Sequence, residues 1–166
     1  MNKKLKFVKV VDNNFNDFVF LLDKMAIYEK HEPLDKEAKN RLKNDAFSDN
    51  PKYEAYLFFT EQELIGYTMF YMTYSSYLAL PVLHVEDLFL LEEYRRIGYG
   101  EIVFRFCALE AKKKGCGRME WTVFDWNEPA IQFYKKIKAT ALKKKYYRMD
   151  KRQLDNFLSI NNILNK

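Results

Sequence analysis

The strongest constraint on the fold is the stretch from Val82 to Leu109, which joins three local patterns. Val82–Leu91 is an apolar run with the composition of a strand. A short charged link and the sequence Arg95–Gly100 follow it, and from there Ile102, Phe106 and Leu109 recur at helical spacing. The stretch therefore predicts a strand, a glycine loop and a helix, in that order.

The glycine loop predicts an anion site. A loop that opens a helix leaves backbone N–H groups available, and the positive end of the helix dipole favours negative charge there. The loop fits neither nucleotide template, because Val103 stands where Gly-x-Gly-x-x-Gly needs its last glycine, and no Gly-Lys-Ser/Thr follows. On the loop alone two interpretations stay open, a phosphate site and a tight turn that uses glycine only for its geometry.

Length and composition predict one domain over residues 1–166 with a substantial core. Apolar residues make up 48% and aromatic residues 17% of the chain, which excludes disorder. No apolar run approaches the roughly 20 residues of a membrane span, and no signal peptide is evident. Cys107 and Cys116 form no disulfide framework, so a reducing cytoplasm is expected. The net charge of +5 favours anions, but the basic residues are scattered and argue against nucleic acid.

The rest of the chain alternates between strand and helix patterns. Gly115–Gly117 ends the central helix, so the strands on either side of it should be parallel. Two strands before Val82 should form a hairpin. The other predicted elements are a strand over Leu5–Val11, helices over Phe15–Tyr28 and Asp35–Phe47, strands over Tyr53–Thr60, Leu64–Tyr74 and Arg118–Phe124, a short helix opened by Asn127–Pro129, a strand over Tyr146–Asp150, and a C-terminal helix that carries Leu154, Phe157 and Leu158.

Two motifs resemble those of a known superfamily. Arg-x-x-Gly-x-Gly, over Arg95–Gly100, resembles the pyrophosphate-binding motif of the GNAT superfamily of acetyl-CoA-dependent N-acetyltransferases, and Asn127 to Tyr134 resembles its second signature, Asn-x-x-Ala-x-x-x-Tyr. Glu86–Leu90 and Trp126–Pro129 look like the diamine (spermidine/spermine) acetyltransferase branch. The resemblance implies an α/β fold of the α+β type, with a central mixed, mostly antiparallel sheet, a parallel splayed strand pair, and helices on both faces.

The resemblance also implies acetyl-CoA as the cofactor. At two positions the chain departs from the branch, because Arg96 and Lys138 stand where glycine is usual. The positions that match the coenzyme-binding residues of the family are Leu88, Phe89, Leu90, Arg95, Arg96, Ile97, Gly98, Tyr99, Gly100, Glu101, Asn127, Glu128, Pro129, Ala130 and Tyr134.

The chemistry of acetyl transfer points to two catalytic side chains. A free alkylamine resembles lysine, with a pKa near ~10, so a base must remove its proton before it attacks the thioester directly. The resemblance places Glu86 as that base and Tyr134 as the acid for the departing thiolate. His84 shares the strand phase of Glu86 and is a second candidate for proton relay. Backbone groups of Leu88–Leu90 would contact the thioester carbonyl oxygen. His31 and His84 have no metal-ligand spacing, so no metal is expected.

The expected acceptor is a primary amine of a small di- or polyamine. A net basic protein repels a polyamine at long range, so this hypothesis needs a local acidic groove. The candidates for this groove are Tyr28, Glu29, Glu32, Glu86, Asp87, Glu120 and Asp125. The resemblance places Glu29, Glu86, Glu120, Trp121 and Thr122 at positions that contact the amine. Two alternatives stay open: an acceptor that is a protein lysine, an N-terminus or an amino acid analogue, and a non-catalytic acyl-CoA-binding sensor. The resemblance also implies a homodimer, without nucleic-acid or membrane partners.

Overall fold

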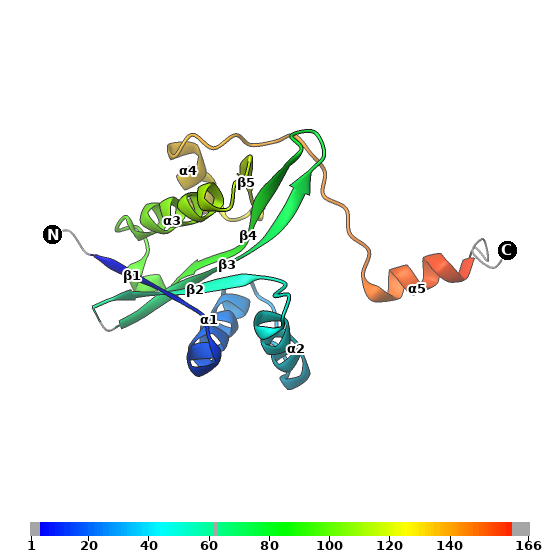
Figure 1. Cartoon of the computed structure of the whole chain (residues 1–166), viewed down its shortest axis with the longest axis horizontal. Coiled ribbons are helices and arrows are strands. Elements are labelled where there is room, and N and C mark those ends of the chain that lie inside the picture. Colours follow the sequence, from blue (N-terminus) through cyan, green and yellow to red (C-terminus); the bar gives the residue numbers. More distant parts are fainter. Residues whose placement is uncertain (1–3, 62, 161–166) are drawn as a thin grey trace. The chain divides into compact units, whose positions relative to one another are not determined.

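The computed structural model describes residues 4–61 and 63–160 (Figure 1). The chain divides into two compact units, residues 1–127 and 128–166. A five-stranded sheet of order β1-β2-β3-β4-β5 organises the first unit. Its strands are β1 (Leu5–Lys9), β2 (Glu54–Thr60), β3 (Glu63–Ser75), β4 (Leu80–Leu90) and β5 (Arg118–Glu120). The first four are antiparallel neighbours, and β4 and β5 are parallel, so the predicted mixed sheet is confirmed.

Helices cover both faces of this sheet, as predicted. α1 (Phe15–Tyr28) and α2 (Lys36–Phe47) lie on one face and α3 (Tyr99–Lys113) on the other (Figure 1). Short 3-10 turns, η1 (Asp12–Asn14) and η2 (Glu92–Tyr94), lead into α1 and toward α3. Asp35 caps α2 by accepting a hydrogen bond from the N–H of Ala38 at 2.7 Å. From β1 to β5 the order of the strands and α-helices therefore agrees with the order expected from the sequence.

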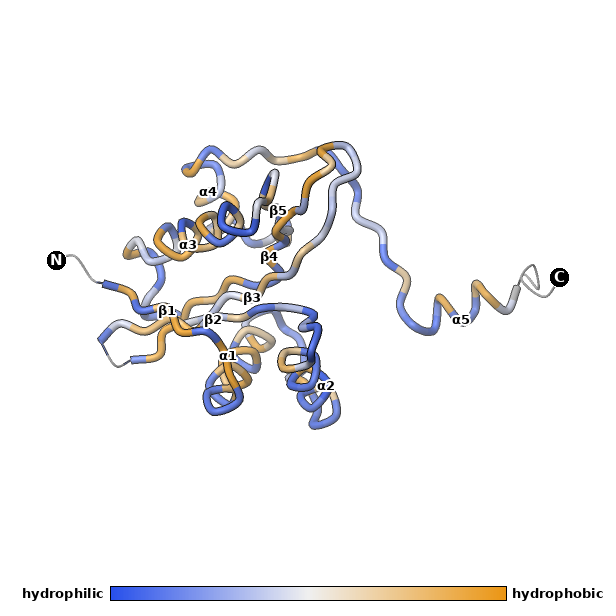
Figure 2. Tube along the Cα trace, viewed as in Figure 1, coloured by the Kyte–Doolittle hydropathy of each residue, from blue (hydrophilic) through white to orange (hydrophobic). Residues whose placement is uncertain are grey.

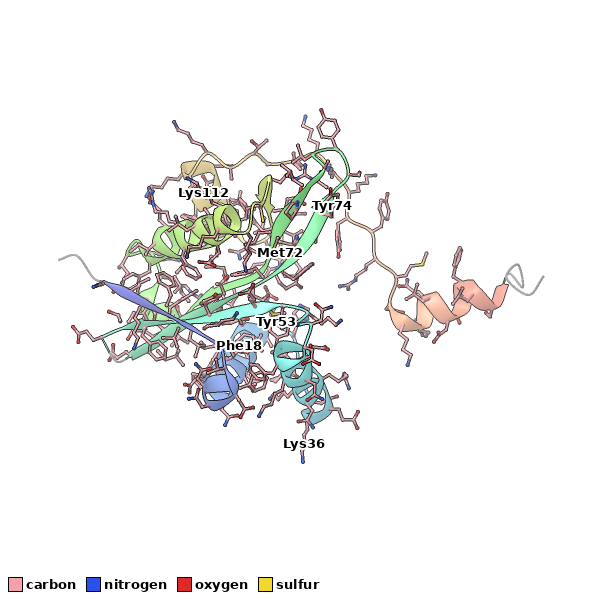
Figure 3. The ribbon with its side chains drawn as sticks, viewed as in Figure 1. Phe18, Lys36, Tyr53, Met72, Tyr74 and Lys112 are labelled. Atoms are coloured by element: carbon pink, nitrogen blue, oxygen red, sulfur yellow. The ribbon has the colours of Figure 1, made fainter. Side chains whose placement is uncertain are left out.

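Each face of the sheet has its own apolar core. On the α3 face Val103 and Cys107 are buried against Phe58, Ile65 and Leu83. On the other face Phe18 of α1 packs against Tyr53 (Figure 3). Phe18 also packs edge-on against Tyr67 of β3. The apolar colouring follows the strands and the sheet-facing sides of α1 and α3, while α2 is largely hydrophilic (Figure 2). Burial of this kind supplies most of the driving force for folding.

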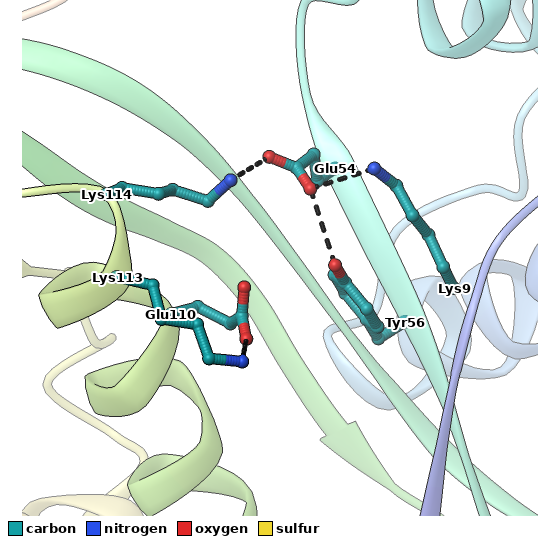
Figure 4. Close-up of polar contacts among 6 residues, drawn as sticks. All are labelled: Lys9, Glu54, Tyr56, Glu110, Lys113 and Lys114. Carbon is teal, nitrogen blue, oxygen red and sulfur yellow. Dashed lines mark hydrogen bonds and ion pairs between the residues drawn. The ribbon is translucent and has the colours of Figure 1, made fainter.

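A glutamate joins the end of α3 to the β1–β2 edge of the sheet (Figure 4). Glu54 of β2 receives Lys9 of β1 at 3.0 Å and Lys114, just after α3. Burial opposes ionisation of Glu54, but the two lysines together keep its pKa below the usual value. Within α3, Lys113 pairs with Glu110 at 2.6 Å. The Lys114–Glu54 pair therefore ties the residue after α3 to β2.

A bulge interrupts β4 at Glu86. Met69 of β3 lies opposite Asp87 and the next residue, Phe70, lies opposite Val85, so Glu86 is the extra residue. A bulge bends its strand and re-aims the side chains around it. Pairing between β4 and β5 ends at His84, two residues earlier. The predicted strand over 118–124 is accordingly shorter than expected, since β5 ends at Glu120 where β4 turns away.

The second unit carries two helices, α4 (Glu128–Lys136) and α5 (Lys151–Ile160), which confirms both predicted helices. The predicted strand over Tyr146–Asp150 is wrong, because residues 139–150 have neither helix nor strand. A strand needs a neighbour for its backbone groups, and none pairs with this segment in the described chain. None of the helices in the described residues is long and apolar enough to cross a membrane.

Candidate active site

The glycine loop adopts a backbone shape that suits an anion. Gly98 is left-handed, with φ 97°, and α3 begins at the next residue. A Cβ placed on Gly98 or Gly100 would meet no atom within 4 Å, so the space beside both is open to a ligand. Arg96 is also left-handed, with φ 62°, where the related branch uses glycine. The first N–H groups of a helix lack intrahelical acceptors and favour negative charge, so this loop fits a pyrophosphate.

Beside this loop, the end of β4 has lost its parallel neighbour. Leu88, Phe89 and Leu90 lie past the last β4–β5 pair, on the splayed part of the strand. On the other side, β3 holds them closely, since a Cβ on Gly66 would lie 2.2 Å from the carbonyl oxygen of Phe89. Residues 88–90 of β4, which are predicted to contact the acetyl end of the coenzyme, therefore pair with β3 along one edge and lie beyond the β5 pairing along the other.

The bulge brings carboxylates to the face of β4 that α1 covers. His84 Nε2 lies 3.7 Å from Glu86 Oε2, so the predicted histidine and glutamate are neighbours. The Tyr67 hydroxyl lies 3.1 Å from Asp87 Oδ2, to which it donates, and 2.9 Å from the sulfur of Met25 in α1. Thr68 donates to the backbone carbonyl of Asp87 at 2.8 Å and fixes the bulge from β3.

These acids influence one another's ionisation. Burial raises the pKa of Asp87 to about 7, and the charges of Glu86 and Glu29 add to that rise. Burial also raises the pKa of Glu29, at the end of α1, while His31 opposes the rise. The pKa of Tyr67 lies well above its usual value because of burial and the same carboxylates. Glu29, Glu86 and Asp87 therefore share one electrostatic neighbourhood around Tyr67.

The other predicted amine-binding residues lie farther along β5. Glu120 is the register partner of His84 and receives Arg118 Nε at 2.7 Å. Trp121 packs edge-on against Phe104 of α3, with ring centroids 4.8 Å apart. Thr122 is exposed in the segment that follows β5. The structure thus groups Glu29 with Glu86, whereas Arg118 already partly neutralises Glu120.

An aromatic cluster lies at the end of α1. Tyr28 stands 5.8 Å from Trp126 and 6.2 Å from Phe89, measured between ring centroids. Trp126 stacks on Phe124 at 5.6 Å. The guanidinium carbon of Arg95, the first residue of the loop motif, lies 4.4 Å from the centre of the Tyr28 ring and 5.1 Å from that of Phe89.

In the second unit, Tyr134 lies on α4 and is partly buried. Burial raises the pKa of its phenol to about 12. The turn after α4 keeps the shape expected of a glycine-ended helix. Lys138 has φ 62°, its N–H donates to Lys135, and the N–H of Ala139 donates to the Tyr134 carbonyl. These are the two bonds of a Schellman motif. The departure from glycine at Lys138 therefore does not change the turn, while the approach of Tyr134 to Glu86 stays a prediction.

Comparison with known proteins decides the family. The model of the acetyltransferase (GNAT) family matches residues 22–138. The chain belongs to the GNAT family of acetyltransferases. It is an acyltransferase of the N-acetyltransferase class, and the GNAT fold explains the parallel strand pair, the splay and the glycine loop together.

Several GNAT relatives match over different lengths. L-ornithine N5-acetyltransferase of Arabidopsis thaliana is 42% identical over 47% of this chain, and the match covers only 34% of the plant enzyme. Thialysine N-epsilon-acetyltransferase of Caenorhabditis elegans is 28% identical over 93% of this chain and 98% of its own length. Among solved structures, an integron cassette protein from the mobile metagenome of V. cholerae superposes with TM-score 0.78 at 21% identity, covering 92% of this chain and 96% of its own. That structure shows the shared fold.

Three features of this candidate site were not predicted from the sequence. Tyr67 is one of twelve tyrosines and lies in an apolar strand, so nothing in the pattern marks it as a partner of Asp87. The stack of Arg95 on Tyr28 joins residues 67 positions apart, and neither residue signals the other. The bulge at Glu86 also lacks a sequence signal, because the strand pattern runs on through it.

Proposed function

We propose that this GNAT chain is an acetyl-CoA-dependent N-acetyltransferase that acts on a primary amine of a small di- or polyamine by direct attack. The acids on the α1 face of β4 carry the proposal. Glu29, Glu86 and Asp87 gather around Tyr67, and among the described residues no lysine or arginine forms an ion pair with them. In a chain of net charge +5, such a cluster is the local feature that a polycation needs.

Each carboxylate has a suitable environment for a different task. Glu86 is exposed beside His84, so it can accept the proton of an incoming ammonium and pass it toward solvent. Asp87 is held by Tyr67 and titrates near neutrality, so an ammonium beside it would favour its ionised form. Glu29 would hold a second positive charge of the substrate. Different environments for adjacent acids commonly separate their roles.

The coenzyme residues are proposed from the loop and the splayed strand. The backbone N–H groups of 96–101 would hold the pyrophosphate, and Leu88–Leu90 would donate to the thioester carbonyl oxygen. Acetyl-CoA supplies the acetyl group and the thiolate that leaves. Tyr134 would give its phenolic proton to that sulfur, since a phenol with a pKa of about 12 holds its proton at neutral pH. Asn127–Ala130 complete the proposed coenzyme contacts.

The relatives favour a second candidate acceptor, an amino acid with a side-chain amine. Ornithine and thialysine, named in two relatives, each carry a carboxylate beside an α-amine. A cluster of three acids would repel that carboxylate. We therefore expect the corresponding diamine, which lacks the carboxylate, to be the better acceptor.

Matched substrate pairs test this order. Thiol release from acetyl-CoA is followed with ornithine against 1,4-diaminobutane and with lysine against 1,5-diaminopentane, and spermidine is added as the longer amine. The two substrates of each pair differ by a single carboxylate. The ratio of their kcat/KM values therefore reports how strongly the carboxylate disfavours the amino acid. We expect the diamine to lead by at least tenfold in both pairs. A lead for the amino acids would make the second candidate correct, and no release with any amine would overturn the enzyme proposal.

The remaining proposals concern assembly and setting. We propose a homodimer formed through the C-terminal segment, with neither nucleic acid nor membrane as partner. A reducing cytoplasm suits the free cysteines Cys107 and Cys116. Burial raises the pKa of Cys107 to about 11, which makes its thiol unreactive.

A further inference from the structure

The side chain of Arg95 makes contacts within the chain, near the proposed amine-binding residues. Its Nε donates to the carbonyl oxygen of Leu90 at 2.7 Å, and its guanidinium lies over the rings of Tyr28 and Phe89. Its backbone N–H donates to Glu92 at 3.1 Å. The backbone N–H and the Nε of Arg95 therefore already donate within the chain, and its planar cation lies over two aromatic rings, a packing that guanidinium groups favour.

Tyr28 is the point at which this packing meets the acids. It is the last residue of α1, and Glu29 follows it directly. The end of α1 is a tight turn: His31 donates to Ala26 at 2.8 Å, and Lys30 has φ 61° without being glycine. The N–H of Lys30 also donates to the carbonyl of Ile27 at 3.1 Å, so this turn closes with the same pair of hydrogen bonds as the turn after α4. Arg95 contacts this end of α1 through the ring of Tyr28.

The loop residues at 96–101 begin at the very next position after Arg95. Movement of the loop on binding an anion would therefore displace the guanidinium of Arg95 and the Tyr28 ring that it contacts. It would also displace Glu29, the next residue in the chain. Coupling between two sites requires a shared element whose position both ligands bias. The bridge from Leu90 through Arg95 to Tyr28 is such an element.

We propose that Arg95 is a positioning residue that couples the coenzyme loop to the amine site by holding Tyr28, and with it Glu29, against the end of β4. This inference rests on the proposed function for its substrate, and on geometry alone for the link. On this proposal the exposed side chain of Arg96 supplies the positive charge that faces the phosphates, and the side chain of Arg95 does not bind them.

Hydrogen exchange tests the link without catalysis. The probes are the amides of Glu29, Lys30 and His31, compared in wild type, Arg95→Gln and Arg96→Gln, with and without coenzyme A. We expect Arg95→Gln to speed exchange at these amides at least fivefold, and Arg96→Gln to leave them within twofold of wild type. Coenzyme A should slow their exchange in wild type but not in Arg95→Gln. Tyr28→Phe should keep the slow exchange, whereas Tyr28→Leu should lose it.

Kinetics separate positioning from phosphate binding. In Arg95→Gln the KM for the diamine should rise at least fivefold, while the Kd for coenzyme A changes less than twofold. In Arg96→Gln the pattern should reverse. If Arg95→Gln weakens coenzyme A tenfold and leaves the α1 amides unchanged, the coupling role is overturned. If wild type acetylates no amine, the proposed function fails, and the exchange measurements still decide the role of Arg95.

Discussion

At the scale of single residues, the adjacent acids Glu86 and Asp87 differ in what surrounds them. Glu86 is exposed beside His84, whereas Asp87 accepts a hydrogen bond from Tyr67, whose hydroxyl also contacts the sulfur of Met25 in α1. The β4 bulge makes this difference, because it places two consecutive side chains near the same face. An uninterrupted strand would have turned one of them toward α3.

The two proposed catalytic groups yield the most direct prediction. Glu86→Gln and Tyr134→Phe should each lower kcat with the preferred diamine at least tenfold, because general acid or base catalysis commonly contributes about 10²-fold or more. Thiol release measured under saturating acetyl-CoA tests this. Glu93→Gln, an exposed acid in η2, is the matched control and should stay within twofold of wild type. Full activity in Tyr134→Phe would remove its role as the acid.

The buried carboxyl of Asp87 predicts a dependence of stability on pH. The pKa of Asp87 is raised in the folded chain to about 7 from the usual 3.8. Below pH 3.8 the carboxyl is protonated in both the folded and the unfolded chain, so it does not lower the free energy of unfolding. As pH rises from 3.8 toward 7, the free energy of unfolding falls progressively. Wild type should lose roughly 2–3 kcal/mol more than Asp87→Asn between pH 5 and pH 8. Urea unfolding of both proteins at the two pH values measures this difference. Equal losses would show that Asp87 titrates normally.

At the scale of elements, the sequence predicted most of the framework and little of its fine geometry. Apolar periodicity located α1, α3 and the four long strands, because each buries a face at its own period, whereas the charged helix α2 was predicted without such a face. It also predicted a strand over 146–150, where an alternating pattern lacks a neighbour to pair with. The bulge at Glu86 and the contact of Tyr67 with Asp87 depend on register between strands, which one strand's pattern does not encode.

The close packing of β3 on β4 predicts that Gly66 tolerates no side chain. Gly66→Ala would place a methyl group 2.2 Å from the Phe89 carbonyl oxygen and push β4 away. The free energy of unfolding should fall by about 2–3 kcal/mol, as for other overpacked sites. Coenzyme A should also bind more weakly, because Leu88–Leu90 move. Thr73→Ala, on the exposed part of β3, should change stability by less than about 0.5 kcal/mol.

The turn after α4 predicts a stabilising substitution. Lys138 is left-handed, so Lys138→Gly should raise the free energy of unfolding by about 0.5–1 kcal/mol, the cost of a Cβ in that conformation less the added freedom of the unfolded glycine. Lys135→Gly, inside α4, should lower it by about 1 kcal/mol. Thermal unfolding of the two variants shows whether each is more or less stable than wild type. A loss of stability in Lys138→Gly would mean that the lysine side chain itself holds the turn.

At the scale of the whole molecule, the C-terminal helix α5 exposes an apolar face that a partner chain would bury. Leu154, Phe157 and Leu158 of α5 are each about half exposed, at 48%, 57% and 59%. An amphipathic helix gains its stability by burying such a face. The proposed homodimer would bury it against a second copy.

Solution mass tests that assembly. The chain has a mass of 20.0 kDa, so a dimer should sediment with twice that mass. The double substitution Leu154→Glu with Phe157→Glu should shift the protein to the monomer at micromolar concentration, since it places charge on the buried side of the interface. Asp155→Lys, on the same helix, is the control and should leave the mass unchanged. A wild-type monomer would overturn the homodimer.

The left-handed backbone at Arg96 and Lys138 has a consequence for how relatives of this chain are recognised. Both positions keep the bend that glycine usually permits, although the side chain there is long and cationic. A signature that insists on glycine would therefore pass over chains like this one while their loops remain intact. Searches that allow a basic residue at either bend should recover further acetyltransferases, and a basic residue at the first bend would add a positive charge beside the proposed phosphate site.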